Sequence, residues 1–167
     1  VFDRNAAAYE SNMEGLAYRI PETLTPMLAA EMGTAARALD ILDLGCGSGW
    51  CGPLLRPFAR HLVGLDLSPA MLSLAQEKGS YDALVEGEIL GALHNWRPHS
   101  FDAVIPANVV LYFGDLAPLA AAVARVLRPG GVFVFDVEAL IDELEHDLAD
   151  PVLAEPVVAA VVAVALV

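Results

Sequence analysis

A glycine-rich loop at the end of an apolar run constrains the fold of this chain more than any other feature. Residues 38–44 form a compact apolar run that predicts a buried strand, and Gly45, Gly47 and Gly49 follow at alternate positions. Glycines spaced in this way remove side chains where the backbone turns sharply and approaches a ligand closely. The loop therefore predicts a ligand site, with a tight strand-to-helix turn that binds nothing as the alternative.

Short apolar runs and helical stretches alternate along the rest of the chain. Four more strands are expected, at residues 61–67, 83–86, 101–106 and 132–137. One helix is expected to begin after Ser68-Pro69 and to end at Gly79, and another to begin at Asp115 and to stop at Pro129-Gly130-Gly131. This alternation predicts an α/β fold with a doubly wound, mostly parallel sheet of the Rossmann-like kind.

Both ends of the chain differ from this repeating pattern. Residues 1–38 are expected to form an N-terminal helical lead-in, with its second helix over residues 21–39, and residues 39–167 the α/β core. An amphipathic helix is expected over residues 138–149. The last eleven residues are all Val, Ala or Leu. They are too few for a bilayer span of about 20 residues. Since the end of the chain has room for at most one more strand, the C-terminal strands of the sheet are expected to be incomplete.

Composition argues against several partners. The chain of 167 residues carries 22 acidic and 9 basic residues, a net charge of −13, which disfavours nucleic acid. Cys46 and Cys51 have no second pair or nearby histidines at metal-ligand spacing, so no metal and no disulfide are expected. A reduced, cytoplasmic location without a membrane anchor is the expectation. His94 and His99 are interpreted as residues of a surface loop.

Two residues near the glycine loop indicate the kind of ligand. Asp66 is expected at the end of the second strand, where a carboxylate accepts hydrogen bonds from the hydroxyls of a ribose. Trp50 stands where the dinucleotide-binding motif requires Gly or Ala for close helix packing. An adenosine-like ligand is therefore expected, and a nicotinamide dinucleotide is disfavoured.

Four segments together resemble the class I S-adenosylmethionine-dependent methyltransferase family over roughly residues 39–138. They read ILDLGCGSG at 41–49, LDLSPAML at 65–72, FDAV at 101–104 and LRPGG at 127–131. Within that family, the lead-in and residues 50–55 are most similar to the methyltransferases often fused to tetratricopeptide repeats. The resemblance implies that residues 39–167 are an S-adenosylmethionine-binding core, with a repeat domain upstream.

The resemblance also assigns roles by position. Asp43 and the loop would hold the methionine part of S-adenosylmethionine, Asp66 its ribose, and Leu67 and Met71 its adenine. The full set assigned to the cofactor is Asp43, Gly45, Cys46, Gly47, Gly49, Asp66, Leu67, Met71, Glu88, Ile89, Ala107 and Asn108. The residues expected on the acceptor side are Tyr9, Tyr18, Arg19 and Tyr112.

The expected activity is in-line transfer of the sulfonium methyl group to a small-molecule or protein acceptor, with S-adenosylhomocysteine as the product. Positioning supplies much of the rate in such a reaction, so no residue is assigned as a general base. Two alternatives stay open: a cofactor-binding or interaction module without catalysis, and a nicotinamide-dependent oxidoreductase. The apolar tail would also favour a homo-oligomer if exposed.

Overall fold

The computed structural model describes residues 20–32, 37–107, 109–138 and 158–165. In chain order the elements are helix α2 (Ile20–Met32), strand β1 (Leu39–Leu44), helix α3 (Gly52–Leu55), strand β2 (Ala59–Asp66), helix α4 (Pro69–Lys78), strand β3 (Ala83–Glu86), helix α5 (Ile89–Asn95), strand β4 (Phe101–Ile105), the 3-10 turn η1 (Val110–Tyr112), helix α6 (Ala117–Val126), strand β5 (Leu127–Glu138) and strand β6 (Val158–Ala165).

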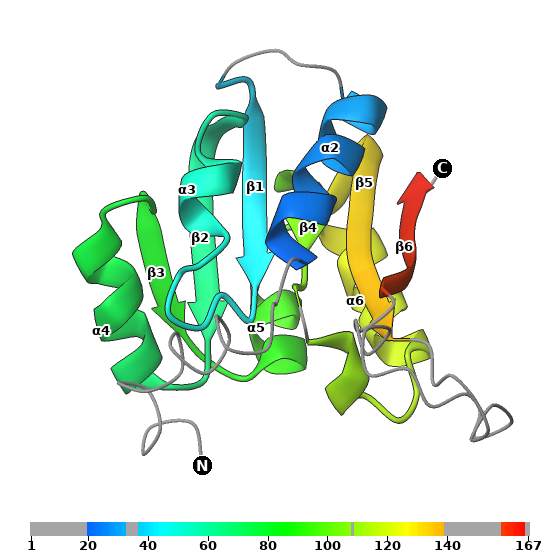
Figure 1. Cartoon of the computed structure of the whole chain (residues 1–167). Coiled ribbons are helices and arrows are strands. Elements are labelled where there is room, and N and C mark those ends of the chain that lie inside the picture. The colour runs from blue at the N-terminus through cyan, green and yellow to red at the C-terminus, as the bar shows by residue number, and fades with distance from the viewer. Residues whose placement is uncertain (1–19, 33–36, 108, 139–157, 166–167) are drawn as a thin grey trace, which may run out of the picture.

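The strands form one sheet in the order β3-β2-β1-β4-β5-β6. All neighbours from β3 to β5 are parallel, and β6 pairs antiparallel with β5. The predicted fold class is therefore confirmed, and the apolar tail contributes one strand. Parallel pairing carries the carboxyl ends of β1 to β5 to one edge of the sheet, at the bottom of Figure 1.

Helices cover both faces of this sheet, which explains why apolar residues of its strands are buried on both sides. Alternate residues of each strand serve different layers. Ile41 packs with Leu24 and Leu28 of α2, whereas its neighbour Leu42 packs with Leu93 of α5 and Leu119 of α6. Figure 1 shows α2 and α3 in front of the sheet and α5 and α6 behind it.

Some predicted boundaries and elements were wrong. The predicted helix over residues 21–39 ends at Met32, and Leu39 already begins β1, because that leucine is buried among the strand residues of the sheet. Strand β5 begins at Leu127, five residues earlier than predicted, and includes the Pro-Gly-Gly segment. His94 lies in the last turn of helix α5 rather than in a loop, and its exposed ring nitrogen Nδ1 is 2.6 Å from the Leu90 carbonyl oxygen.

The predicted start and stop signals of α4 are confirmed. Ser68 is the N-cap, and its hydroxyl accepts a hydrogen bond from the Met71 N–H. Gly79 ends the helix in the left-handed conformation at φ +63°. Because Ser68 performs the capping, the carboxylate of Asp66 two residues earlier is not required to cap this helix. The helix predicted over residues 138–149 is wrong at its first residue, because Glu138 is still paired in strand β5. Its remaining residues, and the predicted helix within residues 1–19, lie outside the described residues.

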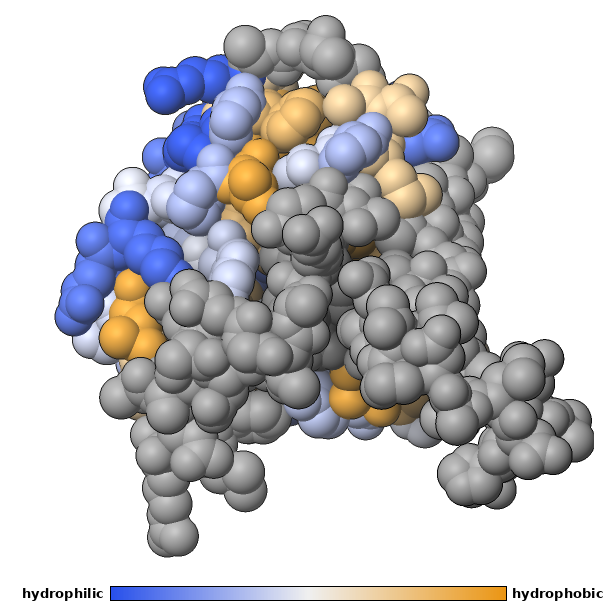
Figure 2. Space-filling model, in the orientation of Figure 1, coloured by the Kyte–Doolittle hydropathy of each residue, from blue (hydrophilic) through white to orange (hydrophobic). Residues whose placement is uncertain are grey.

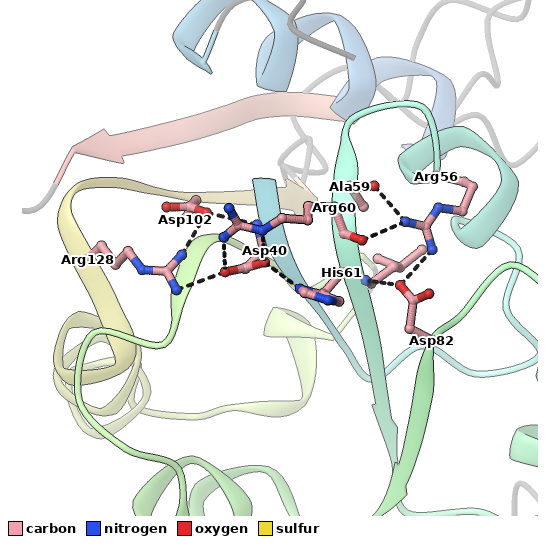
Figure 3. Close-up of polar contacts among 9 residues, drawn as sticks. Asp40, Arg56, Ala59, Arg60, His61, Asp82, Asp102 and Arg128 are labelled. Carbon is pink, nitrogen blue, oxygen red and sulfur yellow. Dashed lines mark hydrogen bonds and ion pairs between the residues drawn. The ribbon is translucent and has the colours of Figure 1, made fainter. Parts of the chain in front are cut away.

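The amino ends of the strands are tied together by charged side chains (Figure 3). Asp40 of β1 pairs with Arg60 and His61 of β2 and with Arg128 of β5, at 2.5 to 3.0 Å. Arg128 also bonds Asp102, which accepts a further bond from the Asp40 N–H at 2.8 Å. The arginine and histidine partners hold the pKa of Asp40 well below its usual range. This cluster joins the amino ends of strands β1, β2, β4 and β5, at the edge of the sheet opposite the glycine loop.

Hydropathy varies over the visible surface. In the view of Figure 2, hydrophilic residues gather on the side of α4 and apolar residues show over α2. Within the described part of the chain, no helix has the length and apolar character needed to cross a membrane.

Candidate functional site

The glycine loop leaves the sheet where the direction of strand order reverses. Strand β1 lies between β2 and β4, and the chain runs outward from it in both directions. Ligands of open α/β sheets bind beside the carboxyl ends of the strands at such a point. The loop after β1 therefore lies where the fold favours a ligand.

A cavity of about 370 Å³ opens beside this loop. That volume is within the range of about 300–1,000 Å³ typical of small-molecule sites. Its walls come from the loops that follow β1 to β4. They are formed by Gly45, Gly47, Asp66, Leu67, Met71, Gly87, Glu88, Ile89, Ala107, Val109, Tyr112 and Phe113. Most of the lining is apolar, and two carboxylates supply charge.

Two of the glycines let the backbone form the wall of this cavity. Gly45 has φ +78°, and a Cβ atom there would lie 2.3 Å from Cγ2 of Val109. Gly47 has φ +51°, and a Cβ atom there would point into open space with no atom within 4 Å. Side chains at either position would strain the turn. At Gly47 a side chain would also occupy room that the loop leaves open.

The carboxylate of Asp66 is oriented by two backbone groups. Its Oδ2 accepts a hydrogen bond from the Gly47 N–H, and its Oδ1 accepts one from the Ser68 N–H, each at 2.8 Å. Each oxygen of an ionised carboxylate can accept further bonds. Asp66 therefore lies at the cavity wall with acceptor capacity left on both oxygens, as a ligand with a pair of hydroxyls requires.

A smaller cavity of about 30 Å³ lies beside the same loop. It is lined by Asp43, Gly45, Cys46, Gly47, Ser48, Trp50, Cys51 and Ala107. It shares Gly45, Gly47 and Ala107 with the larger cavity, so the two adjoin. Oδ1 of Asp43 and Oγ of Ser48 are buried and have no hydrogen-bond partner among the described residues. Two buried polar atoms without partners indicate a site for a group that donates hydrogen bonds.

One oxygen of the Asp43 carboxylate is hydrogen-bonded to Tyr81. The Tyr81 hydroxyl donates to Oδ2 of Asp43 at 2.7 Å. The pKa of Asp43 is raised to about 7: burial is the largest cause, the nearby Asp66 also raises it, and the Tyr81 hydrogen bond acts in the opposite direction. Burial also raises the pKa of the Cys46 thiol, and the two carboxylates add to that shift, so Cys46 is a neutral neighbour rather than a reactive thiolate.

These features fit S-adenosylmethionine. The ligand has an adenine for the apolar part of the cavity, two ribose hydroxyls for Asp66, and an ammonium group that donates hydrogen bonds. Asp43 supplies the buried oxygen without a partner that such an ammonium group needs. The glycine loop lets the ligand approach the backbone between these two carboxylates.

The structure brings most of the predicted site residues together. Nine of them line the larger cavity and two more, Asp43 and Cys46, line the smaller one. Gly49 lines neither cavity in the described part of the chain. It has φ +81°, and a Cβ atom there would lie 3.0 Å from Ala75 and from Tyr81. Tyr9, Tyr18, Arg19 and Asn108 lie outside the described residues.

Glu88 has a local role that the sequence did not reveal. It is the N-cap of α5, and its two carboxylate oxygens accept hydrogen bonds from the N–H groups of Leu90 and Gly91 at 2.9 and 2.8 Å. It also lines the larger cavity, and its place beside the adenine stays a prediction. Its carboxylate, however, is directed to the start of its own helix.

Sequence reasoning missed Tyr81, Val109 and Phe113. Val109 and Phe113 flank the 3-10 turn after β4 and line the cavity, and a cavity-facing role of an apolar loop residue has no local sequence signal. Tyr81 lies 38 residues from its partner Asp43. The sequence indicated its position only indirectly, because the glycines that leave room for its ring, Gly49, Gly52 and Gly64, lie in separate elements.

The fold and this site define an α/β protein that binds an adenosine-containing cofactor. Residues 42–135 match the methyltransferase domain family, which is more than half of the chain. The chain therefore belongs to that methyltransferase family, and the predicted class and its cofactor, S-adenosylmethionine, are confirmed at the level of the family. The match leaves no support for the nicotinamide-dependent alternative.

Two curated relatives carry specific names. The malonyl-[acyl-carrier protein] O-methyltransferase of Pectobacterium atrosepticum is 32% identical over 135 residues, which are 80% of this chain and 50% of the relative. The trans-aconitate 2-methyltransferase of Yersinia pestis is 36% identical over 109 residues, which are 64% of this chain and 41% of the relative. The chain spans about half or less of the length of the curated relatives it matches.

Solved structures agree with the fold. An amino pentose methyltransferase from Micromonospora echinaspora, with bound S-adenosylmethionine, has a TM-score of 0.59 at 30% identity, over 77% of this chain and 55% of its own. An S-adenosylmethionine-dependent methyltransferase from Mesorhizobium loti has a TM-score of 0.55 at 35% identity, over 68% and 52%. Within the described part of this chain, no group of three or more His, Cys, Asp or Glu side chains is placed to hold a metal ion.

Proposed function

We propose that this chain binds S-adenosylmethionine in the 370 Å³ cavity and transfers its methyl group to a small-molecule acceptor. The observation that carries the proposal is the Asp66 carboxylate, held by the Gly47 and Ser68 N–H groups at the cavity wall. When bound, S-adenosylmethionine supplies a methyl group already activated on a sulfonium sulfur. The protein then has to bind the cofactor and place the acceptor in line with that methyl group.

The residues of the chain divide this work by position. Asp66 accepts the ribose hydroxyls, while Leu67, Met71 and Ile89 pack against the adenine. Glycines 45 and 47 let the amino-acid part of the cofactor lie against the loop backbone, next to Asp43. The mostly apolar lining of the cavity lowers the local dielectric constant around the reacting centre, which strengthens the electrostatic contacts there.

Tyr112 is the described residue best placed to contact an acceptor. It lines the cavity yet is 62% exposed, so it lies at the mouth. Leu67 is 65% exposed at the same cavity. A phenol hydroxyl at the mouth suits a small organic acceptor with polar groups. Contacts near the acceptor stay predictions for four further residues, Asn108, Tyr9, Tyr18 and Arg19.

The names of the relatives support a small metabolite as the acceptor. They name a malonyl group on a carrier protein, trans-aconitate and an amino pentose. Two of these acceptors carry carboxylates and one carries an amine. We propose a small carboxylic acid or amine in preference to a protein side chain.

Finer expectations from the sequence remain proposals. They are the division into a lead-in of residues 1–38 and a core of residues 39–167, the likeness to methyltransferases fused to tetratricopeptide repeats, an upstream repeat domain or a homo-oligomer, and a cytoplasmic location. Leu24 and Leu28 of α2 pack in the same core as β1, so the last part of the lead-in folds with the sheet.

A methyl-transfer assay tests the proposal. The chain is incubated with methyl-labelled S-adenosylmethionine and a panel of di- and tricarboxylic acids and amino sugars. We expect S-adenosylhomocysteine to form with a labelled product for at least one acceptor, and the Asp66→Ala variant to lose that turnover. If the chain binds the cofactor but gives no turnover above the variant with any acceptor, a binding module without catalysis replaces the proposed enzyme.

A further inference from the structure

We propose that Tyr81 is a positioning residue of the cofactor site: its hydroxyl fixes Oδ2 of Asp43, so that Oδ1 is left to receive the α-ammonium group of S-adenosylmethionine. The proposal rests on the proposed function, because it concerns the amino-acid end of that cofactor. Tyr81 itself does not line either cavity described above. It acts through Asp43.

Tyr81 and Asp43 are in direct contact. The Tyr81 hydroxyl donates a hydrogen bond to Oδ2 of Asp43 at 2.7 Å. Asp43 is buried, with only 1% of its surface exposed. Oδ1 of the same carboxylate has no hydrogen-bond partner among the described residues. A buried carboxylate with one oxygen bound and the other unsatisfied is unfavourable unless a donor arrives. Tyr81 thereby determines which oxygen remains for that donor.

The tyrosine ring is closely surrounded by backbone. Glycines from three separate segments surround it: Gly49 in the loop, Gly52 at the start of α3 and Gly64 in β2. A Cβ atom at these positions would lie 3.0, 2.8 and 3.1 Å from atoms of the ring. Any larger residue at Gly52 would displace the ring. The packing therefore holds the phenol in one place with its hydroxyl toward Asp43.

Asp43 also lines the smaller cavity. Its volume of about 30 Å³ exceeds the 10–15 Å³ that one water molecule needs, and an ammonium group is of similar size. Oγ of Ser48, a residue 1% exposed, is a second buried polar atom without a partner at this cavity. Two acceptor oxygens beside a small space suit a cation that donates several hydrogen bonds.

Protonation also favours this arrangement. Burial and the Asp43 charge raise the pKa of Tyr81, so the phenol remains a donor throughout the neutral range. Two titratable groups act on the pKa of Asp43: Tyr81 lowers it and Asp66 raises it. Cys46 also faces Asp43, as a neutral thiol. The net pKa of about 7 means that loss of the Tyr81 bond would leave more of the carboxyl group protonated at neutral pH.

The test is the Tyr81→Phe variant, which keeps the ring in its glycine pocket and removes the hydroxyl alone. Calorimetry compares two ligands, S-adenosylmethionine and 5′-methylthioadenosine, which keeps the adenosine but lacks the amino-acid part. We expect affinity for S-adenosylmethionine to fall about tenfold, the scale of one hydrogen bond to a charged group. Affinity for 5′-methylthioadenosine should change less than twofold.

A pH profile separates positioning from packing. Between about pH 5.5 and 7.5, below the range in which the α-ammonium group itself deprotonates, wild-type affinity for S-adenosylmethionine should rise with pH as Asp43 ionises. In Tyr81→Phe the same rise should shift to higher pH. The affinity for 5′-methylthioadenosine should stay flat in both proteins. A tyrosine that serves packing alone would lower the melting temperature and leave both profiles in place.

Asp43→Asn provides a second variant in case the phenylalanine variant folds poorly. It should weaken S-adenosylmethionine selectively, and the effects of the two substitutions should not add, because both act through one carboxylate. Equal losses for both ligands, or no loss for either, would overturn the role of Tyr81 while wild-type binding leaves the proposed function intact. Failure of the folded wild type to bind either ligand would instead refute the proposed function.

Discussion

The N–H of Gly47 lies 2.8 Å from Oδ2 of Asp66, and this bond joins the loop after β1 to the end of β2. The same carboxylate is bound on its other oxygen by the Ser68 N–H, at the start of α4. Two rigid backbone groups therefore hold the acid before any ligand arrives. A site with fixed polar groups loses less conformational entropy on binding than one that must order them.

Gly47→Ala tests the loop. A Cβ atom at φ +51° strains the backbone by about 1 kcal/mol but meets no atom within 4 Å. We expect a folded protein whose melting temperature falls by a few degrees. Affinity for S-adenosylmethionine should fall at least tenfold, because the methyl group occupies the space along the loop. Differential scanning fluorimetry and calorimetry measure the two effects.

Gly79→Ala is the matched control for this variant. Gly79 also has a positive φ, +63°, and open space around a Cβ atom, but it lies at the end of α4, away from the cavity. It should lose a similar amount of stability and keep wild-type affinity. Equal affinity in the two alanine variants would show that the loop does not contact the cofactor.

Glu88→Ala removes the N-cap of α5. Its carboxylate oxygens bind the Leu90 and Gly91 N–H groups, so the variant should lose about 1 kcal/mol of unfolding free energy. Urea denaturation measures this loss. Glu88→Gln keeps one acceptor oxygen and should lose less. If both variants were as stable as wild type but bound the cofactor more weakly, the main role of the side chain would be contact with the adenine.

The Asp40 cluster predicts how stability depends on pH. Since its folded-state pKa is depressed, Asp40 stabilises the fold at pH values above its unfolded pKa of about 3.9, and this contribution is lost as pH falls further. Asp40→Asn should be less stable by about 1 kcal/mol at pH 6, a figure reduced for solvent screening. The difference from wild type should shrink below about pH 4.

Thermal melts from pH 3 to pH 7 measure this dependence. Cofactor affinity at pH 7 is the internal control, because Asp40 lies at the opposite edge of the sheet from Gly47 and should leave binding unchanged. A constant difference in stability across this pH range would mean that the Asp40 charge contributes nothing to the cluster.

Much of the fold was predictable because each strand carries its own signal. Ala83–Glu86 is an apolar run between helix signals, and its predicted bounds agree with strand β3. Ser68 and Gly79 bounded α4 correctly, since capping depends on adjacent residues. Helix α5 was missed because its Gly91 and polar His94 and Asn95 resemble a loop, and the burial of Leu93 against α6 that stabilises it is a tertiary effect.

The site was predictable to a similar degree and for the same reason. Asp66 and the glycines 45 and 47 occur in local motifs whose order along the chain indicates a shared sheet edge. The hydrogen bond between Tyr81 and Asp43 joins residues far apart in sequence, and the residues next to Tyr81 form no motif that predicts it. The direction of the Glu88 carboxylate depends on where α5 begins, so a missed helix also hid that contact.

Titration calorimetry of wild type and Asp66→Asn tests most directly whether this chain binds S-adenosylmethionine through Asp66. Asp82→Asn is the control, because Asp82 also accepts a backbone N–H, from Leu62 at 2.8 Å, and lines neither cavity described here. We predict binding to wild type and Asp82→Asn, and affinity weakened at least tenfold in Asp66→Asn. Absence of binding to folded wild type, or equal affinity in all three proteins, would contradict the account.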